Sequence, residues 1–172
     1  MSIMHTTLVG ATNSLGLGDA NAMAHKAWRE LQRARTAQTT NDLRDAVLNA
    51  AITAWHLVDW TWAGIAQTGT REPELAALFG VSGRPVQKGD LIAWAERECP
   101  ELTLCQSLCN GTKHVKSERP LHSHAAAPQG SGVPQLARLE IVDGAATRDA
   151  LDVVEAAVMF WGRQVTRGSV ML

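Results

Sequence analysis

Apolar residues recur every three or four positions along most of this chain, which is the period of an α-helix. The pattern is clearest over residues 19–37, 41–67 and 147–167. In the last of these stretches the apolar residues follow at steps of three and four: Leu151, Val154, Val158, Trp161 and Val165. Each stretch therefore predicts an amphipathic helix with one apolar side turned towards a shared core.

Residue types that start and stop helices mark the expected boundaries of the first two. Asp19 is expected to cap the first helix, because its side chain can accept hydrogen bonds from the free backbone N–H groups there. The run "TTND" at 39–42 offers a similar signal for a long second helix, which runs to about Gln67 and stops before Gly69. This helix carries apolar residues on two sides, so we expect it to lie centrally in a bundle.

Further boundaries predict several shorter helices. Pro73 and Gly80 bound a short third helix, and Asp90 is expected to cap a fourth. Pro100 breaks the chain before a fifth helix, and the last helix is expected to begin at a cap near Thr147.

The segment before the last helix has a different pattern. The run "SERPLHSHAAAPQGSGVP", residues 117–134, has no period and is rich in Pro, Gly, Ser and Ala, which predicts a mobile loop. The run "LARLEIV" that follows alternates apolar and polar residues and predicts a half-buried strand, ended by Asp143 and Gly144. A lone strand needs a partner, and residues 114–119 or 6–10 are the two expected sources.

These patterns predict an all-α fold with a single helical-bundle domain over residues 1–172. It contains about five helices, a small two-stranded β element near 114–142, and an irregular N-terminal arm over 1–18. A chain of this length can bury a substantial core without disulfides or a structural metal.

Composition narrows the setting in which the protein works. The 172 residues include 16 basic and 17 acidic side chains, and a formal net charge of −1 creates no overall field that attracts nucleic acid or anionic lipid. The first residues lack the cationic and apolar regions of a signal peptide, and no run approaches the roughly 20 apolar residues that span a bilayer. We therefore expect a cytoplasmic protein without a membrane partner. The spacing of Cys99, Cys105 and Cys109 matches no zinc site, so these residues are expected to be reduced core thiols.

The first candidate for chemistry is the stretch "AWHLVDWTW" in the second helix. His56 and Asp59 stand at i and i+3, close enough for the carboxylate to orient the imidazole or for both to hold one metal ion. The alternative is a hydrogen-bonded helix histidine beside a solvated aspartate. Trp55 and Trp62 flank the main apolar side and are expected in the core, whereas Trp60 is expected to line a pocket or an interface.

The second candidate is "CNGTKHV", where the fifth helix is expected to end. Asn110, Lys113 and His114 share one face, because they stand at i, i+3 and i+4. The alternative is a polar last turn in which the two cationic residues favour the helix dipole. Because a central helix must satisfy its polar groups inside the fold, we expect His56 and Asp59 to approach this turn.

An Asn followed four residues later by a His, near the end of a bundle helix, resembles the Arg-polar-x3-His motif of the HEPN families. These are all-helical bacterial proteins that include RNase toxins and non-catalytic nucleotide-binding or scaffolding members. The resemblance places Asn110 at the polar position and His114 at the His, but Cys109 stands where the Arg would be. It therefore implies the helical fold without the arginine on which RNase activity depends. The pairing of "AWHLVDW" with "NGTKH" also looks like small bacterial proteins of the accessory gene pool.

Three interpretations of these residues are open. The first is a non-catalytic module that binds a small molecule or a protein partner, through six residues: His56, Asp59, Trp60, Asn110, Lys113 and His114. The second is an RNase or other hydrolase, in which His114 or His56 is the general acid or base, Lys113 steadies anionic charge, and Asn110 and Asp59 orient the histidines.

The third interpretation is a metal site. His56, Asp59 and His114 offer nitrogen and oxygen ligands suited to zinc, manganese or iron, and His122 and His124 are further candidates from the expected loop. Glycine-rich phosphate loops, "HExxH" and nucleophile-elbow motifs do not occur, so the sequence leaves the cofactor unknown. Six tryptophans and a long helix with two apolar sides favour a homodimer formed by helix packing.

Overall fold

The computed structural model describes residues 15–67, 72–113, 122–126 and 138–166. Its elements in chain order are α1 (Ala20–Arg35), α2 (Thr40–Gln67), α3 (Glu72–Phe79), α4 (Lys88–Glu98), α5 (Glu101–Lys113), β1 (His122–Ala126), β2 (Arg138–Asp143), β3 (Ala146–Asp149) and α6 (Ala150–Thr166). The predicted helical fold with a small β element is confirmed. In the described residues it has six helices and three strands rather than about five and two.

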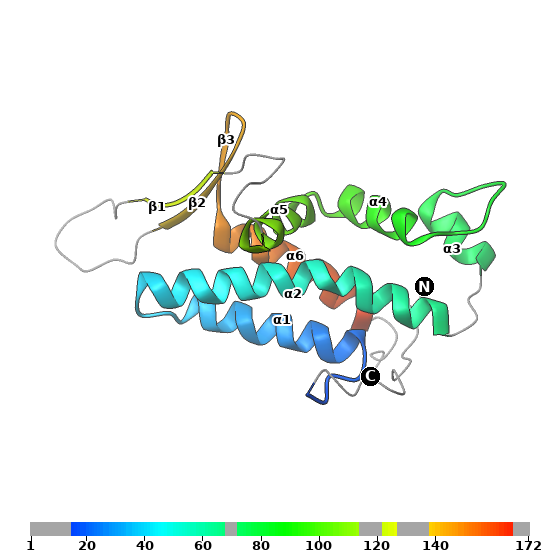
Figure 1. Cartoon of the computed structure of the whole chain (residues 1–172), viewed down its shortest axis with the longest axis horizontal. Helices are drawn as coiled ribbons and strands as arrows, with labels where there is room; N and C mark the ends of the chain where they lie inside the picture. Colours follow the sequence, from blue (N-terminus) through cyan, green and yellow to red (C-terminus); the bar gives the residue numbers. More distant parts are fainter. Residues whose placement is uncertain (1–14, 68–71, 114–121, 127–137, 167–172) are drawn as a thin grey trace.

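Four helices surround the main core, with α2 at its centre. Helix α2 packs against α1, α5 and α6, and α1 and α5 each also pack against α6. Figure 1 shows α1 running along one side of α2 and the α4–α5 segment along the other. Each of the four helices contributes a fully buried side chain to the core: Leu31, Leu57, Leu102 and Trp161. The predicted central position of α2 is confirmed, because α1, α5 and α6 cover different parts of its surface.

The starts of the first two helices follow the predicted capping residues. Asp19 Oδ1 accepts a hydrogen bond from the backbone N–H of Ala22 at 2.7 Å. Thr39 Oγ1 accepts one from the backbone N–H of Asp42 at 3.1 Å and donates to its carboxylate at 2.6 Å. Both bonds satisfy donors that a helix leaves free in its first turn.

The predicted starts of two later helices were wrong by two or three residues. Helix α4 begins at Lys88, and Asp90 lies within its first turn, where the carboxylate accepts from the backbone N–H of Gln87 at 2.8 Å. A hydrogen bond from Arg84 to the same carboxylate lowers the pKa of Asp90 to about 2. Thr147 does not cap α6 but lies in β3, since its segment pairs with β2.

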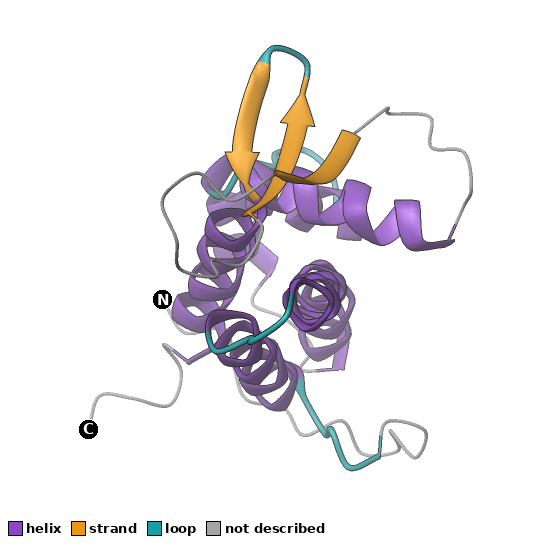
Figure 2. Ribbon diagram, turned by 90° about the vertical axis from the view of Figure 1, so that its left-hand side faces the viewer, coloured by secondary structure: helices purple, strands orange, loops and turns teal. Residues whose placement is uncertain are grey.

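The sheet is antiparallel in the order β1-β2-β3, contacts α6, and lies above the helices in Figure 2. Strand β2 was predicted, and its Ile141 is fully buried. The strands that pair with β2 were not predicted. Strand β1 consists of His122–Ala126, which lie inside the segment predicted to be a loop. This short strand has no alternating pattern of its own, and its backbone pairs with the edge of β2. The remaining loop residues and both expected partner segments lie outside the described residues.

Two other expectations concern the cysteines and the membrane. All three cysteines are buried free thiols, as predicted, and burial raises the pKa of Cys99 to about 11 and also raises that of Cys105. Across the described ranges, no helix combines the length and apolar character needed to cross a bilayer.

Candidate functional site

His56 lies on the side of α2 where α5 packs, and its imidazole is half-buried. Its Nε2 atom is 3.8 Å from the sulfur of Cys109 on α5. This contact brings His56 to the turn that contains Asn110 and Lys113, both of which are exposed. The two stretches singled out in the sequence therefore lie together at one junction of α2 and α5.

Three charged side chains act on the His56 imidazole. Burial is the largest cause that lowers its pKa below 6.5, and the positive charges of Lys113 and Lys26 lower it further. Asp59 acts in the opposite direction. Since Lys26 belongs to α1 and Lys113 to α5, cations from two different helices act on one histidine of α2.

Lys26 is fixed over α2 by a hydrogen bond that the sequence did not reveal. Its ammonium donates to Thr53 Oγ1 at 2.7 Å, nearly one turn of α2 before His56. The buried carboxylate of Glu30 lies 3.7 Å from the same ammonium and 2.8 Å from the guanidinium of Arg33. The Glu30 carboxylate is therefore shared between Lys26 and Arg33, and it neutralises the charge of Lys26 only in part.

Asp59 does not take the predicted role of orienting His56. Its carboxylate forms an ion pair with Lys88 of α4, and both side chains are about half exposed. The structure therefore pairs His56 with Cys109 and Asp59 with Lys88, although the two residues are neighbours on the helix surface. Helix α4 causes this difference, because it supplies a cation that reaches the Asp59 side of α2.

The tryptophans of α2 were predicted to divide between the core and a pocket or interface. Trp55, Trp60 and Trp62 are all partly buried and pack against the core cluster. All three therefore contact the core, and the pocket or interface expected for Trp60 stays a prediction.

The described residues contain no group of three or more His, Cys, Asp and Glu side chains that could hold a metal ion. His114, a member of the predicted ligand set, lies outside the described residues, as does the side chain of His122. His124 stands opposite Glu140 in the β1–β2 pair, with its Nε2 3.4 Å from the carboxylate. Its place in the sheet gives this histidine a structural partner.

The residues that sequence analysis missed are Lys26, Thr53 and Lys88. Each lies on a helix whose course was predicted, but their contacts depend on how α1 and α4 pack against α2. A lysine beside the apolar face of an amphipathic helix is an ordinary pattern, so Lys26 carried no signal of its own.

Comparison of the chain with protein-family models, curated proteins and solved structures gives no match. The resemblance to HEPN proteins therefore stays a prediction, and the chemistry of the site must be argued from its geometry.

The lowered pKa of His56 predicts a pH dependence of stability. In the unfolded chain this histidine takes up a proton near pH 6.5, whereas the folded protein holds it neutral to lower pH. Below pH 6.5 the unfolded state binds more protons, so the free energy of unfolding is expected to fall as the pH falls. Chemical denaturation between pH 8 and 5 measures this loss, which His56→Gln is expected to reduce and His25→Gln, at an exposed position, is not. Equal loss in the wild type and His56→Gln would contradict the prediction.

Proposed function

We propose that this protein is a non-catalytic binding module that takes a small anionic ligand, one bearing a phosphate or carboxylate group, around His56 of α2, on which Lys26 of α1 and Lys113 of α5 both act. The binding residues in this proposal are Lys26, His56 and Lys113, with Asn110 as a further hydrogen-bond donor. Asp59 belongs to the cluster as the residue that holds Lys88 nearby.

One observation carries the proposal: two lysines from different helices act on one half-buried histidine whose neighbouring carboxylate already has a cation of its own. The two carboxylates of the site, Asp59 and Glu30, each already lie beside a cation of another residue, Lys88 and Arg33. Such a site favours an anion, because the ligand gains attraction from both lysines and a hydrogen bond from the imidazole. Binding of the anion also removes the repulsion that opposes protonation of His56.

The surroundings favour binding over catalysis. Cys109 is the hydrogen-bonding group that lies against the imidazole, 3.8 Å from its Nε2, and its thiol is completely buried. A nucleophile must reach its substrate, and a general base must reach the proton that it removes. A buried thiol beside a histidine of lowered pKa provides neither an exposed nucleophile nor a positioned reacting group.

Isothermal titration calorimetry with inorganic pyrophosphate tests the proposal. We expect saturable binding with one ligand per chain, weakened by added salt because screening reduces the attraction of the lysines. Uncharged glycerol is the control and is expected to give no binding heat. Absence of saturable binding at low salt would contradict a site for small anions.

The proposal predicts no ribonuclease activity, whereas a HEPN-like enzyme would cleave RNA. With Cys109 in place of the arginine, the site lacks the guanidinium that would bind a phosphate and stabilise its developing charge. Lys113 is a point charge and does not replace that bidentate fork. We therefore expect structured and single-stranded RNA to remain intact with metal-free and metal-loaded protein, as with His114→Ala. Cleavage by the wild type that disappears in His114→Ala would overturn the non-catalytic role.

A further inference from the structure

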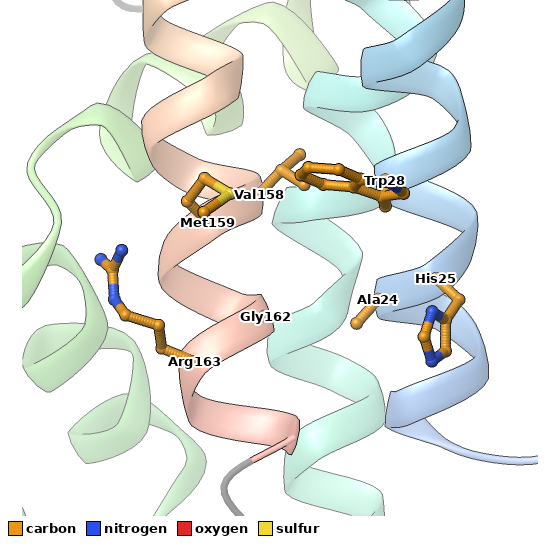
Figure 3. Close-up of a pocket in the computed structure, with 7 residues that line it drawn as sticks. All are labelled: Ala24, His25, Trp28, Val158, Met159, Gly162 and Arg163. Atoms are coloured by element: carbon orange, nitrogen blue, oxygen red, sulfur yellow. The ribbon is translucent and has the colours of Figure 1, made fainter. Parts of the chain in front are cut away.

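The outer faces of α1 and α6 carry two large apolar side chains that the fold leaves exposed. Trp28 of α1 is 41% exposed and Met159 of α6 is 39% exposed. Both line a groove of about 370 Å³ between the two helices, together with Ala24, Val158 and Gly162. Figure 3 shows the indole of Trp28 extending from α1 towards α6, beside Val158.

The groove is held in shape by contacts within the chain. Arg35 forms an ion pair with Glu155 at 2.6 Å, which joins α1 to α6. The same guanidinium lies 5.7 Å from the centre of the Trp28 ring. The guanidinium therefore restrains Trp28 in an exposed position. The Trp28 side chain then loses little freedom when a partner covers it.

Beside this groove, α6 presents a narrow stripe of outward residues with an ordered charge pattern. Asp152, Ala156, Met159 and Arg163 fall within about 60° of arc at 100° per residue. Asp152, Met159 and Arg163 are exposed and Ala156 is half-buried. Figure 3 shows the Arg163 side chain directed away from α1. The stripe thus has an acid at its start, an apolar centre and a base at its end.

This order makes the stripe complementary to itself when two copies run antiparallel. A two-fold axis midway between Ala156 and Met159 sets the small side chain of each copy opposite the large one of the other. The same axis sets Asp152 opposite Arg163 of the second copy, because both residues stand five and a half positions from the midpoint. One register therefore satisfies the apolar centre and both charged ends.

The charges of these two end residues remain available within the chain. Among the described residues, neither Asp152 nor Arg163 forms a salt bridge, whereas Glu155 between them is already paired with Arg35. Asp152 contributes to the field at Arg138, but that guanidinium is bound to Asp149 at 2.6 Å. Asp152 and Arg163 can therefore pair with each other across a two-fold axis between two copies.

We propose that the protein forms a homodimer through α6, packed antiparallel against α6 of a second copy around Ala156 and Met159. In this dimer Asp152 of each copy pairs with Arg163 of the other. Packing on this stripe removes Met159, an exposed apolar side chain at the edge of the groove, from water.

Charge reversal tests this register by sedimentation velocity. The wild type is expected to be a dimer, and Asp152→Arg and Arg163→Asp are each expected to raise the dimer Kd by about tenfold or more. Each reversal replaces two attractive pairs with two repulsive ones. An equimolar mixture of the two variants is expected to recover dimers. In the mixed dimer the introduced arginine of one variant faces the introduced aspartate of the other, and the two native charges meet at the opposite end.

Controls separate loss of association from loss of folding. Asp45→Arg makes the same change at an exposed position of α2 and is expected to leave the dimer intact. Circular dichroism is expected to show unchanged helicity in every variant. A monomeric wild type, single variants that associate like the wild type, or a mixture that stays monomeric would each overturn the proposal. None of these outcomes depends on the anion site, since no ligand is added.

Discussion

Replacing Trp161 with alanine is expected to lower the free energy of unfolding by about 3–5 kcal/mol. Among the residues that the structure describes, Trp161 of α6 is the largest fully buried side chain. Its ring meets that of Phe160 edge to face, with centroids 5.1 Å apart. Phe160 in turn lies 5.5 Å from Trp94 of α4, so the loss is expected to loosen the contact between these two helices as well.

Chemical denaturation of the purified variants measures this effect. Trp28→Ala is the matched control, because it removes the same side chain from an exposed position of α1. The two variants are compared at a protein concentration low enough to exclude association. Losses of equal size would contradict the position of Trp161 in the core.

The second large effect concerns the proposed anion site. Removing Lys26 and Lys113 together, as Lys26→Ala and Lys113→Ala, is expected to weaken pyrophosphate binding about a hundredfold. Each lysine supplies one charge-assisted contact, for which about 1.4 kcal/mol, or tenfold in affinity, is an ordinary magnitude. Calorimetric titration of the single and double variants measures the effect. Because α1 and α5 contribute one lysine each, loss of affinity in both single variants would show that the ligand bridges the two helices.

Arg97→Ala on α4 is the control for this series, since it removes an exposed cation that lies outside the cluster. We expect this variant to bind pyrophosphate as tightly as the wild type. If Arg97→Ala weakened binding as much as the lysine variants, general attraction by surface charge would explain the affinity, and the proposed site would be wrong.

Helix positions were predictable from the sequence because the residues that form a helix and mark its ends lie close together along the chain. The period of apolar residues, together with Asp19, Thr39 and Pro100, indicated where the helices run. Strand β2 was predictable for the same reason, from its alternating pattern. Strand β1 was not, because the run "HSHAA" has no alternation and depends on backbone pairing with β2.

The site was predictable only as far as single helices allow. His56 and Lys113 were found because they stand in unusual local stretches, and packing then brought α2 and α5 together. The partners of each side chain depend on tertiary packing: Cys109 rather than Asp59 contacts His56, and Lys88 takes the carboxylate of Asp59. The approach of Lys26 from α1 to His56 depends on how the two helices pack, so spacing within the sequence could not predict it.

The central claim is that His56 lies in a cationic cluster that binds an anion, and the pKa of His56 reports this most directly. NMR titration of the imidazole, assigned with His56→Gln, gives this pKa with and without saturating pyrophosphate. Without ligand, burial and the two lysines are expected to hold it below 6.5. With ligand, the added negative charge is expected to raise the pKa of His56, and less so in Lys113→Ala. A pKa that is the same with and without pyrophosphate would contradict the account.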